Sequence, residues 1–145
     1  MAKAIRIEEF GGPEVLHWRE VEVGEPGPGE VRVRHTAVGL NFIDTYHRSG
    51  LYPLELPSGL GSEAAGVVEA LGAGVEGVEV GQRVAYTGRP PDAYAEARLI
   101  AAGLLVPLPD AIGDETAAAA MLKGLTAWYL LKRSYPVRPG DTVLL

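Results

Sequence analysis

Asp44 and Glu63 are two carboxylates set in the glycine-rich, least regular parts of the sequence. Loops held on a rigid scaffold often carry functional groups, which makes both side chains candidates for a functional role. A carboxylate flanked by turns more often serves as a hydrogen-bond acceptor for the backbone. We therefore expect both residues to anchor the local structure, and we keep a functional role as the alternative.

Two tyrosines, Tyr46 and Tyr52, flank the short segment 48–50. Aromatic rings in a loop can line a flat pocket for an aromatic ligand. The same rings can instead pack into the core and leave each hydroxyl at its rim. Composition does not distinguish these two arrangements.

Metal chemistry has few candidate ligands in this sequence. There are no cysteines, which excludes thiolate zinc sites, iron–sulfur clusters, disulfides and a cysteine nucleophile. The three histidines, His17, His35 and His47, lack the spacing to one another or to carboxylates that a helix-borne metal site needs. We expect them to be surface side chains or core side chains with satisfied hydrogen bonds.

The segment 72–77 matches the sequence pattern G-x-G-x-x-G, which is typical of dinucleotide-binding loops. That loop requires a strand before it and the N-terminus of a helix after it. The preceding residues suit a strand, but the segment 78–81 alternates and then breaks at a glycine instead of starting a helix. The pattern therefore predicts a plain turn between two strands.

The composition is that of a single globular domain. Of 145 residues, 47% are apolar and 22% are charged, and no stretch of about 18 apolar residues could span a bilayer. The net charge of −6 excludes the basic surface typical of nucleic-acid binding and disfavours contact with anionic membranes. The first six residues do not resemble a secretory signal, so we expect a cytoplasmic protein.

The elements that must position these residues are mainly strands. The 19 glycines and 11 prolines are spread along the chain, which indicates many turns. Phe42 and Tyr46, four residues apart, favour one face of a short helix over 41–48. Alternation and turn residues predict strands over 3–7, 15–23, 31–36, 64–71, 78–86 and 93–100.

The last third of the sequence changes to a helical pattern. Asp114 is the expected N-cap of a helix that Gly124 interrupts and that resumes over 125–133. An apolar strand then begins at Thr142. A domain rarely ends on the first residues of a buried strand, so we expect the chain to be a fragment of a longer protein.

Several segments, in this order and spacing, resemble one family: GLNFID (39–44), RSGLYP (48–53), PSGLGSEAAGVV (57–68), VGQRV (80–84) and LKGLTA (122–127). Together they resemble the N-terminal part of a zinc-free medium-chain dehydrogenase/reductase. Within that family they are most similar to the NADPH:quinone oxidoreductase, or ζ-crystallin-like, group. The resemblance covers nearly the whole chain.

The resemblance implies a mainly β fold, with a GroES-like, partly open β-barrel and a few helices over residues 1–124. Residues 125–145 would be the first helix and strand of a nucleotide-binding Rossmann domain, cut short. Most of the NADPH site and of a homodimer interface would then follow Leu145, so we expect this chain alone to be inactive. The implied activity is NADPH-dependent quinone reduction. The alternatives are a GroES-like binding or structural module without catalysis and another zinc-free enone or alkenal reductase.

The same resemblance implies site residues by motif. Asn41, Tyr46 and Thr126 would lie near the nicotinamide end of NADPH, with Lys123 on the same wall. Tyr46 and Tyr52 would line the quinone pocket. No residue is assigned a catalytic role.

The resemblance also bears on zinc. Zinc-dependent relatives carry a cysteine at the position of Asn41 and a histidine at that of Ser62, and the amide and hydroxyl found here are poor zinc ligands. We therefore expect no zinc. A quinone is already electrophilic, so hydride transfer to it needs no metal.

Overall fold

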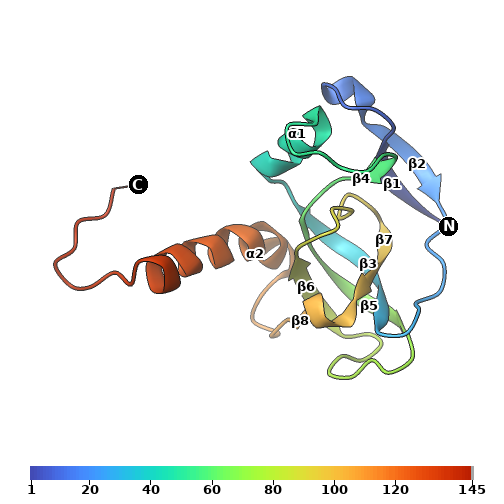
Figure 1. Ribbon diagram of the computed structural model, residues 1–145. Helices are drawn as coiled ribbons and strands as arrows, with labels where there is room; N and C mark the ends of the chain where they lie inside the picture. The colour runs from blue at the N-terminus through green and yellow to red at the C-terminus, as the bar shows by residue number, and fades with distance from the viewer. Residues whose placement is uncertain (145) are drawn as a thin grey trace.

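The computed structural model describes residues 1–144 and shows a body built of strands, from which one long helix extends (Figure 1). Its elements in chain order are β1 (Ala2–Ile7), the 3₁₀ turn η1 (Pro13–Val15), β2 (His17–Val21), β3 (Glu30–Gly39), α1 (Phe42–Ser49), β4 (Ser58–Gly59), β5 (Glu63–Leu71), β6 (Arg83–Thr87), β7 (Ala97–Ala101), the 3₁₀ turn η2 (Ala102–Leu104), β8 (Val106–Pro107), α2 (Asp114–Tyr129) and the π-helical turn η3 (Leu130–Ser134). This confirms the predicted mainly β fold class. Across the described residues, no helix is long and apolar enough to cross a membrane.

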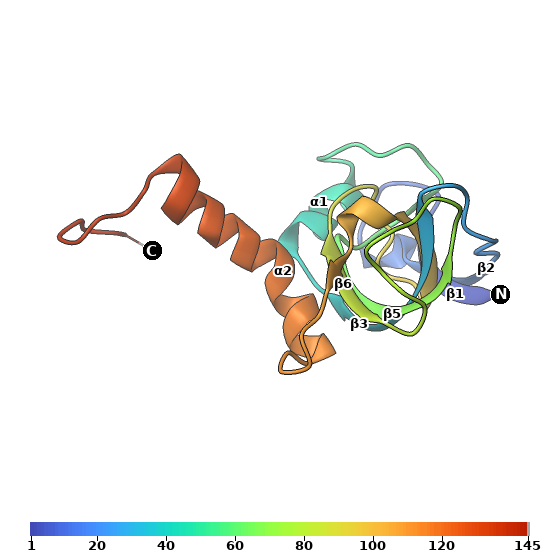
Figure 2. The same ribbon diagram turned by 90° about the horizontal axis from the view of Figure 1, so that it is seen from below.

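The strands form two antiparallel sheets. The larger has the order β7-β3-β5-β6-β8, and the smaller has the order β2-β1-β4. A bridge between Ala4 and Ala95 and a hydrogen bond from the Ile5 N–H to the Tyr94 carbonyl connect β1 of the smaller sheet to the segment that leads into β7 of the larger one. The strands curve around a common interior, as expected for a partly open barrel (Figure 2).

Alternate residues of neighbouring strands fill this interior. Val31 and Val33 of β3, Val68 of β5 and Val84 of β6 are buried, together with the ring of Tyr86. This is the period-two pattern that the sequence predicted for 31–36. Each large side chain that is fully buried contributes roughly 1.5–3 kcal/mol, so these residues stabilise the partly open barrel.

The glycine-rich segment 72–77 is a turn that follows β5 and leads through an irregular loop into β6. Gly74 and Gly77 have φ angles of 75° and 82°, in the left-handed region that favours glycine. The prediction of a plain turn is therefore confirmed.

Helix α2 has Gly113 as its N-cap, so the predicted N-cap, Asp114, is the first helical residue instead. The Asp114 carboxylate accepts hydrogen bonds from Thr36 Oγ1 (2.6 Å) and from Arg83 Nε (2.8 Å). These bonds hold the pKa of Asp114 below its ordinary value. A side chain bound to the sheet cannot also cap the helix, which is why the local prediction was wrong.

Helix α2 also runs without a break through Gly124, where the sequence predicted an interruption. One glycine costs a helix only about 1 kcal/mol, and tertiary packing overrides that cost. The packing comes from Ala117 and Ala118, which are buried against Ala65 of β5 and Ala85 of β6. The predicted domain boundary after residue 124 therefore falls inside a continuous helix.

The strand predicted from Thr142 onward is not formed. Residues 142–144 have no regular secondary structure, and Leu145 lies outside the described residues. A β-strand needs a neighbouring strand to bond its N–H and C=O groups. This part of the chain lies beyond the far end of α2, away from both sheets (Figure 1), so it has no strand to pair with.

Candidate functional site

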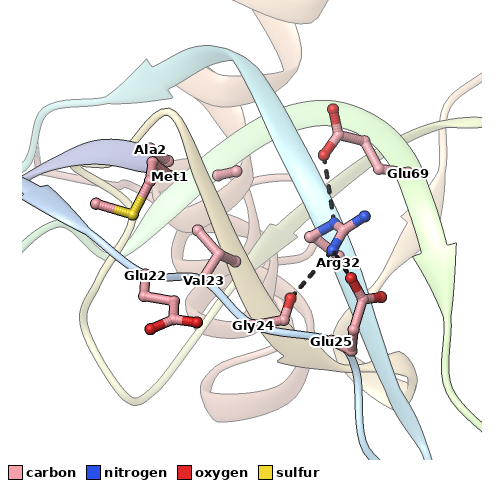
Figure 3. Close-up of a pocket in the computed structure, with 9 residues that line it drawn as sticks. Met1, Ala2, Glu22, Val23, Gly24, Glu25, Arg32 and Glu69 are labelled. Atoms are coloured by element: carbon pink, nitrogen blue, oxygen red, sulfur yellow. Dashed lines mark hydrogen bonds and ion pairs between the residues drawn. The ribbon is translucent and has the colours of Figure 1, made fainter.

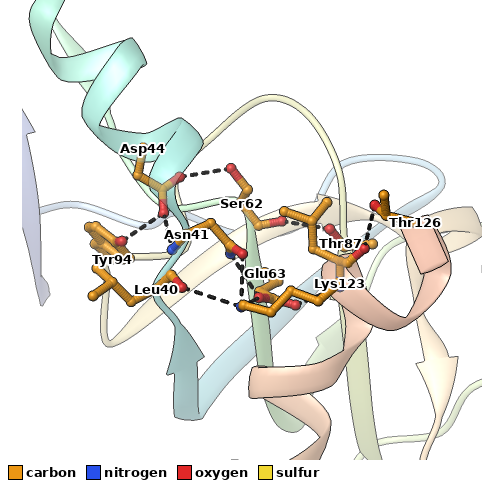
Figure 4. A network of polar contacts seen from close by, with 10 residues as sticks. Leu40, Asn41, Asp44, Ser62, Glu63, Thr87, Tyr94, Lys123 and Thr126 are labelled. Atoms are coloured by element: carbon orange, nitrogen blue, oxygen red, sulfur yellow. Dashed lines mark hydrogen bonds and ion pairs between the residues drawn. The ribbon is translucent and has the colours of Figure 1, made fainter. Parts of the chain in front are cut away.

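Asp44 is buried at the start of α1 and accepts the hydrogen bonds of a local polar network (Figure 4). Its Oδ1 accepts from Ser62 Oγ (2.9 Å). Its Oδ2 accepts from the Tyr94 hydroxyl (2.7 Å) and from the backbone N–H of Asn41 (3.0 Å), the latter being one half of a capping box. Burial and the hydrogen bond to Asp44 raise the pKa of Tyr94, so its hydroxyl keeps its proton and remains a donor.

Glu63, the first residue of β5, is fully buried and binds three donors. Its Oε1 accepts from Asn41 Nδ2 (2.7 Å) and from Lys123 Nζ (3.0 Å). Its Oε2 accepts from the backbone N–H of Leu122 (2.6 Å). The ammonium charge and the hydrogen bonds offset the cost of burying a carboxylate. Because the donors come from the start of α1 and from α2, Glu63 joins both helices to the sheet.

Lys123 completes this cluster from α2. Its ammonium donates to Asn41 Oδ1 (2.8 Å), to Glu63 Oε1 (3.0 Å) and, at a longer distance, to the Leu40 carbonyl (3.3 Å). An ammonium has three N–H donors, so all of them are used within the chain. Asn41, Glu63 and Lys123 thus form a closed polar triangle, in which each residue contacts the other two.

The register of the sheet brings this polar triangle together. Strand β3 pairs with β5 so that Gly39 lies opposite Glu63, which puts Asn41, two residues later, beside the carboxylate. A Cβ at position 39 would overlap the Glu63 side chain and the carbonyl oxygen of Ala118. Glycine is therefore required where α2 passes the end of β3.

Tyr46 and Tyr52 lie ring to ring, with their centroids 5.3 Å apart. Phe42 packs edge-on against Tyr46 at 5.3 Å, which confirms the predicted aromatic face of α1. Phe42 is 74% exposed and Tyr52 is 43% exposed. The three rings form an aromatic ladder, and the exposed Phe42 and Tyr52 give it an open outer surface.

The structure brings two of the four predicted cofactor residues into direct contact, because Asn41 and Lys123 share a hydrogen bond. Thr126 lies one turn further along α2, where its hydroxyl donates to the Leu122 carbonyl (2.7 Å). Tyr46 belongs to the aromatic ladder, and within residues 1–144 no side-chain hydrogen bond joins it to the other three. The predicted residues therefore form two groups, one at the junction of α2 with the barrel and one on α1.

The sequence did not single out Tyr94 or Leu122 as members of the network. Tyr94 reaches Asp44 from a loop outside the quoted motifs, and Leu122 contributes a backbone N–H, which every residue type except proline carries, so the sequence does not mark either one as a member of the network. Asp44 and Glu63 were expected to anchor the backbone through hydrogen bonds. Both do so, since each accepts a backbone N–H.

The histidines follow the expectation only in part. His17 is exposed, whereas His35 is satisfied, because Nδ1 donates to the Ala95 carbonyl (2.6 Å) and Nε2 accepts from the Tyr86 hydroxyl (2.9 Å). His47 is buried in α1, and neither of its ring nitrogens has a partner within the described chain. Burial lowers the pKa of both His35 and His47. Within the described chain, the expected hydrogen bonds are therefore present for His35 and not for His47.

A cavity of about 470 Å³ lies elsewhere, beside the segment that links β2 to β3 (Figure 3). Arg32 at its wall is already bound by Glu25 (2.9 Å) and by the Gly24 carbonyl (3.1 Å), with Glu69 3.5 Å away. The predicted site residues are not among those that line it. Its arginine is paired with neighbouring carboxylates, so we assign it no role in the site.

Residues 27–110, more than half of the chain, match the model of the alcohol dehydrogenase GroES-like domain family. The chain belongs to this family. The match ends before α2 begins at Asp114. The polar triangle therefore joins the GroES-like domain to a helix outside the matched residues.

Individual relatives of this GroES-like chain include oxidoreductases. The quinone oxidoreductase of Pseudomonas aeruginosa is 59% identical over 99% of this chain and 45% of its own length. The 2-haloacrylate reductase of a Burkholderia species is 48% identical over 100% of this chain and 45% of its own length. The crystal structure of Escherichia coli quinone oxidoreductase complexed with NADPH has a TM-score of 0.94 at 47% identity, over 97% of this chain and 43% of that one.

These comparisons confirm the resemblance to quinone oxidoreductases that the sequence motifs indicated. They also show that the GroES-like chain spans less than half the length of these relatives.

Proposed function

We propose that this chain is the GroES-like part of an NADPH-dependent quinone reductase and forms one wall of its site. The observation that carries the proposal is the 59% identity to a quinone oxidoreductase over 99% of the chain. It is supported by the Escherichia coli quinone oxidoreductase complexed with NADPH, which shares the fold at a TM-score of 0.94.

In this proposal Asn41, Tyr46, Lys123 and Thr126 lie at the nicotinamide end of NADPH, and Tyr46 and Tyr52 line the quinone pocket. NADPH supplies the hydride, which no protein side chain can provide. The chain's own residues bind and orient the reactants, because the inclined rings of the aromatic ladder offer apolar faces and ring edges to a quinone ring. The site also has a donor to offer, since the second Nδ2 hydrogen of Asn41 has no acceptor among the described residues.

The same residues do not suit a zinc ion. Asn41 Oδ1 is bound to the Lys123 ammonium, and the Ser62 hydroxyl donates to Asp44. A zinc ion would have to displace the ammonium, and it would then meet an amide and a hydroxyl in place of thiolate and imidazole ligands. We therefore propose that the reaction proceeds without zinc, on an acceptor that is electrophilic without a Lewis acid.

We further propose that the whole protein is a cytoplasmic homodimer and that residues 125–145 open its nucleotide-binding domain. The exposed apolar side chains of this region, such as Trp128 and Leu130, support a further covering domain or subunit.

The test uses a full-length protein that contains this chain. It should oxidise NADPH in the presence of benzoquinone, and elemental analysis should find no stoichiometric zinc. A chelator should leave the rate unchanged. Failure of benzoquinone to accelerate NADPH oxidation would overturn the proposal, and about one zinc per chain would overturn its zinc-free part.

Reduction of an electron-poor alkene is the second candidate, because the 2-haloacrylate reductase is 48% identical over the whole chain. Comparing NADPH oxidation with benzoquinone and with a haloacrylate separates the two. A higher kcat/KM for the haloacrylate would favour the second candidate.

A further inference from the structure

Glu63 occupies an unusual position, because its buried carboxylate binds a backbone N–H in the interior of a helix. Leu122 lies well inside α2 (Asp114–Tyr129). Its single N–H hydrogen is directed at Glu63 Oε2 (2.6 Å), and this bond competes with the bond that an α-helix forms to the carbonyl of Ala118. The carboxylate therefore helps to hold this turn of α2 against the barrel.

The other carboxylate oxygen fixes the orientation of the Asn41 amide. An asparagine amide can be turned over, which exchanges the positions of Oδ1 and Nδ2. Here Oδ1 faces the Lys123 ammonium (2.8 Å) and Nδ2 faces Glu63 Oε1 (2.7 Å). The reverse orientation would set N–H groups against the ammonium and the oxygen against the carboxylate. The two charges therefore permit only one orientation.

That orientation leaves Asn41 with an unused donor. The second Nδ2 hydrogen has no acceptor within residues 1–144, although Asn41 as a residue is only 6% exposed. A donor of a nearly buried residue gains free energy when an oxygen atom of a ligand accepts its free hydrogen.

We propose that Glu63 is a positioning residue, which holds Asn41 as a hydrogen-bond donor to an oxygen atom of a bound ligand and couples that donor to α2 through Leu122. The inference rests on the proposed function only for the identity of the ligand, whose oxygen would belong to the nicotinamide or the quinone. The positioning itself is a property of this chain and needs neither molecule to be measured.

The test is NMR spectroscopy of Glu63→Gln, with Glu69→Gln as the matched control. Glu69 lies on the same strand, but its carboxylate is at the surface, 3.5 Å from Arg32 and 3.3 Å from Arg34. Glutamine at position 63 offers one acceptor oxygen to three donors and adds its own N–H groups. The Asn41 side-chain amide resonances should therefore shift, and the Leu122 amide hydrogen should exchange with solvent at least about tenfold faster. The control should change neither.

Lys123→Arg keeps the inference testable if Glu63→Gln fails to fold. Arginine keeps a positive charge beside the buried Glu63 carboxylate, and Lys123 is 56% exposed, so the larger side chain should spare the fold. This variant should shift the Asn41 amide resonances and leave the exchange rate of the Leu122 amide unchanged. Asn41 resonances that match the wild type in the folded variants would overturn the inference. Shifts as described, in a full-length protein without NADPH oxidation, would support the positioning and reject only the proposed ligand.

Discussion

Asn41 and Lys123, 82 residues apart in the sequence, meet at 2.8 Å between Oδ1 and Nζ. The contact connects the residue before α1 to the middle of α2. The buried Glu63 carboxylate accepts a hydrogen bond from each of the two side chains, Asn41 and Lys123. Because the match to the GroES-like family ends at residue 110, this contact also links the barrel to the part of the chain that follows it.

Replacing Asp44 by asparagine should lower the free energy of unfolding by about 2–3 kcal/mol. The new amide keeps the size of the carboxylate but turns an acceptor oxygen into a donor. At least one of the buried donors from Ser62, Tyr94 and Asn41 then loses its acceptor. Urea denaturation measures the change. Asp110→Asn, at an exposed position, is the control and should change stability by less than about 0.5 kcal/mol. Equal stability of the two variants would mean that the network contributes little.

Replacing His47 by leucine should raise the free energy of unfolding. Both ring nitrogens of His47 are buried without a partner in the described chain, and an unsatisfied buried polar group costs roughly 1–3 kcal/mol. We expect a gain of about 1 kcal/mol at neutral pH. A loss of stability would show that the ring has a bonding partner, such as an ordered water molecule.

The gain from His47→Leu should grow in acid. Burial lowers the pKa of His47 below 6.5 in the folded chain, so the unfolded chain takes up a proton at a higher pH. Above about pH 6.5 the proton uptake of His47 in the unfolded chain does not reduce the free energy of unfolding of the wild type. As the pH drops below that value, this free energy falls. His35 shifts in the same direction but is present in both proteins, so its effect cancels. Urea denaturation at about pH 7.5 and about pH 5.5 measures the difference, and a gain of equal size at the two pH values would contradict the expectation.

Tyr46→Ala or Tyr52→Ala should raise the KM for quinones in a full-length protein that carries this chain. Losing one ring of the aromatic ladder removes about 1–1.5 kcal/mol of binding free energy from aromatic contacts, which corresponds to a roughly tenfold higher KM for the quinone. The KM for NADPH should change little, since most of its site would lie elsewhere. Tyr→Phe at the same positions keeps the rings and serves as the control. An unchanged quinone KM in both alanine variants would favour the core-packing interpretation.

The 145-residue chain alone should bind NADPH no more tightly than about millimolar and should show no quinone reductase activity. The residues proposed to face the nicotinamide form only one wall of the site. Contacts on one side of a ligand give a binding free energy that hardly exceeds the entropy cost of immobilising the ligand. Calorimetric titration of NADPH into the chain measures the affinity. Micromolar binding would show that the cofactor site lies within these residues.

Local patterns determined much of the fold from the sequence by itself. The alternation over 31–36, the glycine turn at 72–77 and the pairing of Phe42 with Tyr46 all depend on interactions between near neighbours. Such interactions have the same geometry in any protein, so their periodicity is sufficient to predict them. Motif spacing likewise indicated the family to which the chain belongs.

Only the tertiary structure decided the polar triangle and the course of α2. Glu63 bonds to Asn41, 22 residues away, because of the β3–β5 register, and to Leu122, 59 residues away, because α2 lies across the sheet. The predictions for Asp114 and Gly124 were wrong for the same reason. The free energy of a local helix preference is about 1 kcal/mol, and the tertiary packing of α2 and the bonds from Asp114 to the sheet together outweigh it. A buried polar group must find a partner, but which distant segment supplies it is set by the packing of the whole sheet.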